Sequence, residues 1–430
     1  MTSIPADLDF AERMASIGYK NKKRVVQQPI NGTTFTFSNN GPELPIYGNK
    51  PNSFCDNTNM ILYADIVNTN ATANCTFKFE GRVGTGGAIK NLYIRSAGGE
   101  QISTIKNYHL LYAAKLQQNA TSNWYNGRGK RLYRHASTPF DNTNGTIGVG
   151  STIESALPLT LSSFFDCKYW ILEGQTTYIS MDLESSLIAA IGGNAACTAT
   201  DLQLQNVRLV YDVYEMDPAA WSAVKAQYGG VFRYYGHEYL HRTDSLAVNV
   251  TEITTTLGWK KKYLTKLIAG LRPTAQTTAR ASPSLTNRNQ CLVTEYSLSH
   301  DGSTLGEKAI EYKSGVLTYA EMLKANGGLW EMHGDEMNTD GLFTGTGDAG
   351  VALAGTSDAT VGSFLMTLDF ESLFQDQHSR SGIDVYNSLQ FNIKKSSVNQ
   401  LTTLDIFGEY SSEIILDLNQ NGMIICPDNK

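Results

Sequence analysis

The chain has 430 residues and a net charge of −6, from 35 basic and 41 acidic side chains. This length favours two or three domains, and the mild acidity argues against a surface coated with nucleic-acid-binding groups. Hydrophobic residues make up 41% of the chain and charged residues 18%, a balance that excludes a disordered protein. The polar residues are mostly Asn, Thr, Ser, Gln and Gly, which favour short strands and turns over long helices.

The N-terminal segment has the clearest helical pattern in the sequence. The apolar residues Phe10, Met14 and Ile17 recur at i, i+4 and i+7, and Gly18 supplies a stop. Four basic residues follow directly: Lys20, Lys22, Lys23 and Arg24. We therefore interpret residues 1–30 as an amphipathic helix and a basic arm. Such a segment either contacts an anionic surface, as of a membrane or a nucleic acid, or docks as a short helix beside a solvated charge cluster.

From residue 33 onward the pattern changes from a helical to an alternating period. Residues 34–37 and 61–67 alternate, and Asn, Gly, Pro and Ser interrupt the runs. Many short strands at turn-rich spacing predict an all-β chain built of sandwiches or barrels. Short helices are predicted at residues 108–116, 184–191, 218–227 and 319–325.

Three pairs of segments indicate that the chain contains an internal repeat. The pairs are residues 178–187 with 365–374, residues 207–213 with 404–410, and residues 91–98 with 295–302. They occur in the same order at similar offsets, and loops of unequal length change an offset without reordering the elements. We therefore predict a first domain over residues 31–217 and a second over residues 218–430, with a linker helix at residues 218–228.

One segment, His237-Glu238-x-x-His241, matches the zincin motif. In a zincin both histidines lie on one face of a helix and bind zinc, while the glutamate activates a bound water. Residues 229–236, which precede the motif, are aromatic, interrupted by glycine and strand-like, and Arg242 places a charge directly after it. This context argues against a zinc site. We expect no enzyme here, and we predict no metal, no cofactor and no catalytic residues.

The cysteines and the start of the chain bear on the compartment in which the protein is made. The six cysteines form no C-x-x-C pair and no zinc-ribbon spacing, so we interpret them as buried thiols. Asp7, Asp9 and Glu12 interrupt any early apolar run, so no signal peptide is predicted. Both features favour a reducing compartment.

Several stretches carry a resemblance to a known family: residues 89–111, 157–165, 178–183, 206–213, 217–220, 404–410 and 413–417. They resemble strands, a turn, a helix and the linker helix of the double jelly-roll major capsid proteins of tailless double-stranded DNA viruses. That group includes the polinton-like viruses and the virophages. The resemblance covers most of the chain from about residue 30 onward, and it agrees with the internal repeat.

The resemblance implies assembly rather than catalysis. The implied fold is a double jelly roll, in which two eight-stranded β-sandwich domains stand side by side with short helices in their connections. Three chains would present six similar lobes, giving a trimer with a pseudo-hexagonal outline that tiles an icosahedral shell. The H-E-x-x-H segment would fall near the first strand of the second jelly roll. The Gly/Asn/Thr-rich residues 326–360 would be a candidate for the outer surface.

The resemblance also implies partners. They are further copies of the chain in a homotrimer, neighbouring capsomers, and minor capsid or penton proteins. The N-terminal segment suits the inner side of the shell, where it would contact an internal membrane, a minor protein or the genome. The candidate contacts are Phe10, Met14, Ile17, Lys20, Lys22, Lys23 and Arg24. The chain is then expected in the virion, after synthesis inside the host cell, and removal of residues 1–24 is expected to spare the trimer but weaken shell assembly.

Two other functions stay open at this point. One is a zinc metalloprotease that uses the His237-Glu238-x-x-His241 motif on a β scaffold. The other is a two-domain β-sandwich protein that binds carbohydrate or acts as an adhesin, for which sandwiches and exposed aromatic residues are common. Stoichiometric zinc would favour the first, and glycan binding by an isolated half without self-assembly would favour the second.

Overall fold

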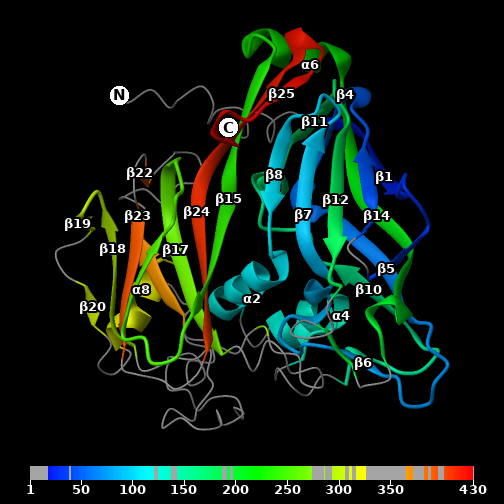
Figure 1. Ribbon diagram of the computed structural model, residues 1–430. Helices are drawn as coiled ribbons and strands as arrows, with labels where there is room; N and C mark the ends of the chain where they lie inside the picture. The colour runs from blue at the N-terminus through cyan, green and yellow to red at the C-terminus, as the bar shows by residue number, and fades with distance from the viewer. Residues whose placement is uncertain are drawn as a thin grey trace.

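The computed structural model of the chain shows two β-sandwich lobes that lie side by side (Figure 1). It describes residues 18–37, 40–120, 124–136, 143–185, 191–193, 197–273, 285, 293–305, 309–311, 316–325, 365–370, 382–385, 389–395 and 401–429. Within these ranges every strand pairs inside its own lobe, β1 to β14 in the first and β15 to β25 in the second. Helix α6 (Pro218–Gln227) lies between the lobes in sequence. No helix in the same ranges is long and apolar enough to cross a membrane.

The first lobe has one large sheet, sheet A, built around the long central strand β14. Its strands are β1 (Tyr19–Gln27), β2 (Thr34–Thr36), β4 (Asn49–Cys55), β5 (Ile61–Asn68), β10 (Thr152–Leu157), β11 (Trp170–Glu173) and β14 (Leu202–Met216). One edge of β14 pairs with β1 and β2, and the other pairs with β5 and β4. Strands β10 and β11 pair with β5 and β4 on their far side.

The second sheet of this lobe, sheet B, has the strand order β3-β12-β7-β8. Its strands are β3 (Glu43–Ile46), β7 (Ile89–Ser96), β8 (Gln101–Ile105) and β12 (Thr177–Leu183). A small third sheet contains β6 (Phe77–Phe79), β9 (Thr146–Ile147) and β13 (Ile191–Gly193). The connections hold α2 (Tyr108–Asn119), α4 (Lys130–Leu132), α5 (Ser163–Asp166) and the short turns η1 (Asn57–Asn59), η2 (Gly84–Ala88), η3 (Tyr125–Gly129) and η4 (Ala199–Asp201).

The second lobe repeats this arrangement with sheets D and E. Sheet D contains β15 (Val231–Leu246), β17 (Lys261–Pro273), β21 (Met366–Asp369), β22 (Ile383–Val385), β24 (Thr402–Asp417) and β25 (Met423–Ile425). Sheet E contains β16 (Glu252–Thr256), β18 (Val293–His300), β19 (Ser303–Thr304), β20 (Ile310–Glu311) and β23 (Leu389–Lys395). The helical segments are α8 (Val316–Ala325), η6 (Leu418–Gln420) and η7 (Pro427–Asn429).

The two lobes share one strand order. Sheet A runs β1/β2, β14, β5, β10, and sheet D runs β15, β24, β17, β21. Sheet B runs β3, β12, β7, β8, and sheet E runs β16, β23, β18, β19. In both, the first long strand of the lobe pairs with the last long strand in one sheet, and a helix, α2 or α8, follows the edge strands of the other. Two facing four-stranded sheets connected in this way form a jelly roll.

This correspondence tests the internal repeat. The match of residues 207–213 with 404–410 is confirmed, because β14 and β24 are equivalent, and so is the match of residues 91–98 with 295–302, which lie in β7 and β18. The match of residues 178–187 with 365–374 is wrong. Strand β12 lies inside sheet B, whereas β21 lies at the edge of sheet D, and the true counterpart of β12 is β23. Alternation marks any half-buried strand and does not identify its place in a sheet.

Three of the four predicted helices are present. Helix α6 has the predicted bounds, since Pro218 occupies its first turn and the Asp217 carboxylate accepts a hydrogen bond from the Ala219 backbone N–H at 2.9 Å. Helices α2 and α8 cover the predicted positions with longer bounds. The helix predicted at residues 184–191 is wrong at its end, because Ile191 begins β13 and pairs with Phe79. Its middle lies outside the described residues, as do residues 326–360.

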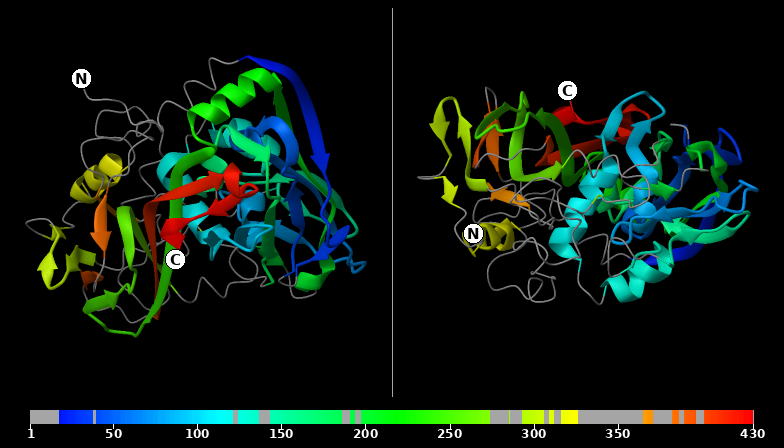
Figure 2. Two further views of the ribbon diagram at one scale, coloured as in Figure 1. Left: turned by 90° about the horizontal axis from the view of Figure 1, so that it is seen from above. Right: turned by 60° about the horizontal axis from the view of Figure 1, so that its bottom comes forward.

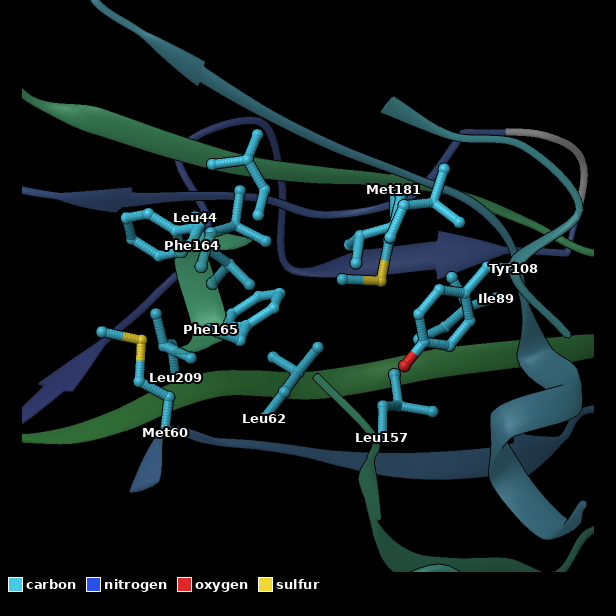
Figure 3. Close-up of a cluster of buried hydrophobic side chains, with 14 of the residues drawn as sticks. Leu44, Met60, Leu62, Ile89, Tyr108, Leu157, Phe164, Phe165, Met181 and Leu209 are labelled. Carbon is cyan, nitrogen blue, oxygen red and sulfur yellow. The ribbon is translucent and has the colours of Figure 1, made fainter. Parts of the chain in front are cut away.

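Each lobe has a hydrophobic core between its sheets. In the first lobe Leu62 and Leu209 of sheet A point toward Leu44, Ile89 and Met181 of sheet B, and each is at most 2% exposed (Figure 3). Burying one such side chain contributes about 1.5–3 kcal/mol. The second lobe has a separate cluster that includes Leu267, Tyr296, Phe391, Leu404 and Ile406.

The described cysteines lie in these interiors as buried thiols. They are Cys55, Cys75, Cys167, Cys197 and Cys426, and all five are buried. The prediction of buried thiols is confirmed for them, and the sixth, Cys291, lies outside the described residues.

Candidate assembly interfaces

The interface between the lobes contains a carboxyl group enclosed by hydroxyls. Glu238 of β15 is 2% exposed, and its Oε1 accepts hydrogen bonds from the Ser162 hydroxyl at 3.0 Å and from the Ser163 N–H and hydroxyl at 2.9 and 2.6 Å. Its Oε2 accepts one from the Ser103 hydroxyl of β8 at 2.6 Å. Burial raises the pKa of Glu238 to about 7, although these hydrogen bonds oppose the rise. The group therefore titrates near neutral pH.

Gly236, which directly precedes the His237-Glu238-x-x-His241 motif, allows the two lobes to approach each other closely. A Cβ on Gly236 would lie 2.6 Å from the Cα of Ser163, which belongs to the backbone of α5 and cannot rotate away. The next residue is tied to the same helix, since the His237 backbone N–H donates to Asp166 Oδ2 at 3.1 Å. Strand β15 and helix α5 are thus in direct backbone contact.

A second buried carboxylate lies under helix α2. Glu409 of β24 is 3% exposed, and the Lys115 ammonium of α2 donates a hydrogen bond to its Oε2. Lys266 Nζ and His237 Nε2 lie 3.7 and 4.0 Å from its Oε1. Burial alone would raise the pKa of Glu409, but the positive charges of Lys115, His237 and Lys266 lower it far below its usual range. Glu409 is therefore ionised, and its negative charge holds helix α2 through Lys115.

A third polar group continues the interface along β24. Asp405 accepts a hydrogen bond from Arg272 Nε at 2.5 Å and one from the Thr243 hydroxyl at 3.1 Å. His241 Nε2 lies 3.5 Å from the same carboxylate, and its Nδ1 lies 3.1 Å from Asn107 Nδ2 of the first lobe. The outer face of sheet D is therefore joined to the first lobe by polar contacts along its length.

These contacts overturn the zinc alternative. The motif lies on β15, a strand of the second jelly roll, and not on a helix. A strand advances about 3.3 Å per residue and alternates its side chains, so His237 and His241, four residues apart, are about 13 Å from each other. Two histidines at that separation cannot share an ion whose Zn–N bonds are about 2 Å long. The placement near the first strand of the second jelly roll is confirmed.

The prediction of a basic arm is wrong for residues 19–27, which form β1 and pair with β14. Lys22 Nζ lies 2.8 Å from Asp212 Oδ2, and Lys23 Nζ lies 3.8 Å from Glu215 Oε2. The basic candidates Lys20, Lys22, Lys23 and Arg24 are all exposed on this strand. The apolar candidates Phe10, Met14 and Ile17 lie outside the described residues. The basic residues are thus part of sheet A.

Comparison with solved structures identifies the fold. VP54 of PBCV-1, fitted into a cryo-EM reconstruction of the virophage Sputnik, matches with a TM-score of 0.60 and 12% identity over 95% of this chain and 97% of that chain. A chain of the PBCV-1 virus capsid matches with a TM-score of 0.61, 10% identity and the same coverage. The Faustovirus major capsid protein matches with a TM-score of 0.54 and 10% identity over 91% of this chain and 90% of that one.

The chain has the double jelly-roll fold. Sheets A and B form the first roll, and sheets D and E form the second. No protein-family model and no curated protein matches the sequence. The likeness therefore lies in the strand order and the packing of the double jelly roll rather than in shared sequence.

Proposed function

We propose that this chain is the major capsid protein of an icosahedral DNA virus, and that three copies form a capsomer with a pseudo-hexagonal outline. The observation that carries the proposal is the presence of two jelly rolls of the same strand order, side by side in one chain. Capsid proteins match this arrangement over 95% of the chain. Three chains supply six similar lobes, and closed symmetry of this kind is the rule among soluble oligomers.

The proposed partners follow from this role. They are two further copies in the capsomer, then neighbouring capsomers, and minor capsid or penton proteins at the positions that a six-lobed particle cannot fill. The proposed location is the virion shell, and residues 1–17 are the proposed contact with an internal membrane, a minor protein or the genome. In this function the ionisable groups between the lobes serve cohesion, and the chain is not an enzyme.

The oligomeric state tests the proposal. Light scattering on the purified full chain is expected to give about 142 kDa, three times the chain mass of 47.2 kDa. A monodisperse monomer that binds glycans would contradict the capsid role and favour the carbohydrate-binding alternative. The measurement needs no knowledge of the virus or its host.

A further inference from the structure

The outer face of sheet D is covered by the chain's own first lobe. On β24, Asp405, Phe407 and Glu409 project from this face and are 1%, 2% and 3% exposed. Lys115 of α2 binds Glu409, and Gln118 of the same helix donates a hydrogen bond to Thr367 of β21 at 3.0 Å. The second jelly roll therefore buries the outer face of sheet D against helix α2, which follows the edge strand β8 of the first jelly roll.

The equivalent face of the first lobe is open around one buried residue, Val210, which is 8% exposed. The confirmed repeat aligns β24 with β14 and places Arg208, Val210 and Asp212 where Asp405, Phe407 and Glu409 stand in the second lobe. Strand pairing agrees, because β17 pairs with Phe407 where β5 pairs with Val210. The side chains of Arg208 and Asp212 are 48% and 36% exposed.

The neighbouring strand shows the same contrast. His241 of β15 pairs with Phe407, and Val26 of β1 pairs with Val210, so His241 and Val26 occupy equivalent positions. The His241 side chain is 9% exposed, whereas Val26 is 56% exposed. The positions around Phe407 that the second lobe buries are therefore exposed around Val210 in the first lobe.

The opposite end of the molecule carries α8, the counterpart of α2. Helix α8 follows the edge strands of sheet E as α2 follows β8. Figures 1 and 2 show α8 with β19 and β20 at one end of the chain, and sheet A with β1 at the other. Leu317 of α8 is 47% exposed, and the eight large exposed hydrophobic side chains of the described residues also include Tyr19, Val26 and Ile30 on or just after β1.

We propose that the open face of sheet A binds the α8 side of the second lobe of another copy, so that the contact inside one chain is repeated between chains. The sheet A face is defined by the exposed residues Val26, Arg208 and Asp212, and the α8 side by Leu317. The interface is heterologous, and a ring of six lobes closes when each lobe is turned about 60° from its neighbour. This inference rests on the proposed function and assigns its trimer contact to residues.

Single charges placed on the two surfaces test the assignment in the full chain. Val26→Asp and Leu317→Asp each place an unpaired carboxylate in the proposed contact and are expected to convert the trimer to a monomer in light scattering at equal concentration. Val248→Asp is the matched control, since Val248 is 43% exposed in the turn after β15, and it is expected to remain trimeric. Thermal unfolding by circular dichroism checks that each variant is folded.

The outcomes separate this inference from the proposed function. A monomeric wild-type chain overturns the capsomer itself. A trimeric wild type whose Val26→Asp and Leu317→Asp variants also stay trimeric leaves the capsomer standing and overturns the assigned interface. As a second measurement, hydrogen exchange at β1 is expected to be slower in the wild-type trimer than in the Leu317→Asp monomer, and equal exchange would contradict the assignment.

Discussion

Glu238 and Glu409 are equally buried in the inter-lobe interface, yet their pKa values shift in opposite directions. Glu238 is enclosed by three serine hydroxyls and one backbone N–H, which are neutral donors and do not compensate for the lost hydration of a carboxylate. Glu409 faces two ammonium groups and an imidazole, and these charges outweigh burial. The surroundings, rather than the degree of burial, decide which carboxyl is charged.

The titration of Glu238 predicts a pH-dependent stability. Its folded pKa of about 7 lies above the value of 4.5 for an ordinary Glu, so its contribution is fully present below about pH 4.5 and is lost as the pH rises through 7. The loss amounts to about 3 kcal/mol between these limits. Glu238→Gln is expected to remove this part of the slope when urea unfolding is measured at pH 5 and pH 8. Glu154→Gln, on an exposed carboxylate, is the control, and an unchanged slope in Glu238→Gln would contradict the account.

The buried Lys115–Glu409 ion pair predicts a large loss of folding stability when one partner is removed. Lys115→Met leaves Glu409 buried without its main partner, and removing one member of a buried pair costs about 3–5 kcal/mol. The double variant Lys115→Met/Glu409→Gln is expected to recover a large part of that loss, as measured by urea unfolding at pH 7. A loss below about 1 kcal/mol in Lys115→Met, the size typical of surface pairs, would mean that the pair is not a buried one.

At the scale of helices and strands, an element can be predicted from the sequence when the residues that determine it are neighbours in the chain. Helix α6 could be predicted with its bounds, because Asp217 and Pro218 are adjacent capping residues. Strand β1 could not, because its first six residues are exposed on both faces and no alternation marks them. Its strand character comes from pairing with β14, which lies more than 180 residues further along the chain.

The place of β1 changes the expectation for N-terminal deletions. Removing residues 1–24 also removes six of the nine residues of β1 and its pairing with β14, so we expect a lower melting temperature and a disturbed first lobe. Removing residues 1–17 leaves β1 whole and is expected to keep the trimer while weakening shell assembly. Light scattering and thermal unfolding of both variants check this. Equal melting temperatures for the two deletions would show that β1 contributes little.

At the scale of the whole molecule, the fold was accessible from the sequence but the inter-lobe interface was not. The repeat of β14 in β24 and of β7 in β18 indicated two related β domains. The contacts that join the lobes connect residues 135 positions apart for Ser103 and Glu238, and 294 positions apart for Lys115 and Glu409. No local pattern relates such residues, since only the packing of one finished lobe on the other brings them together.

The central claim is that two like jelly rolls per chain assemble into a six-lobed capsomer. Negative-stain electron microscopy of the purified full-length chain tests it most directly, because the number of lobes per particle is visible without any partner. We expect particles with six similar lobes and a pseudo-hexagonal outline. Particles of only two lobes at assembly concentrations would contradict it.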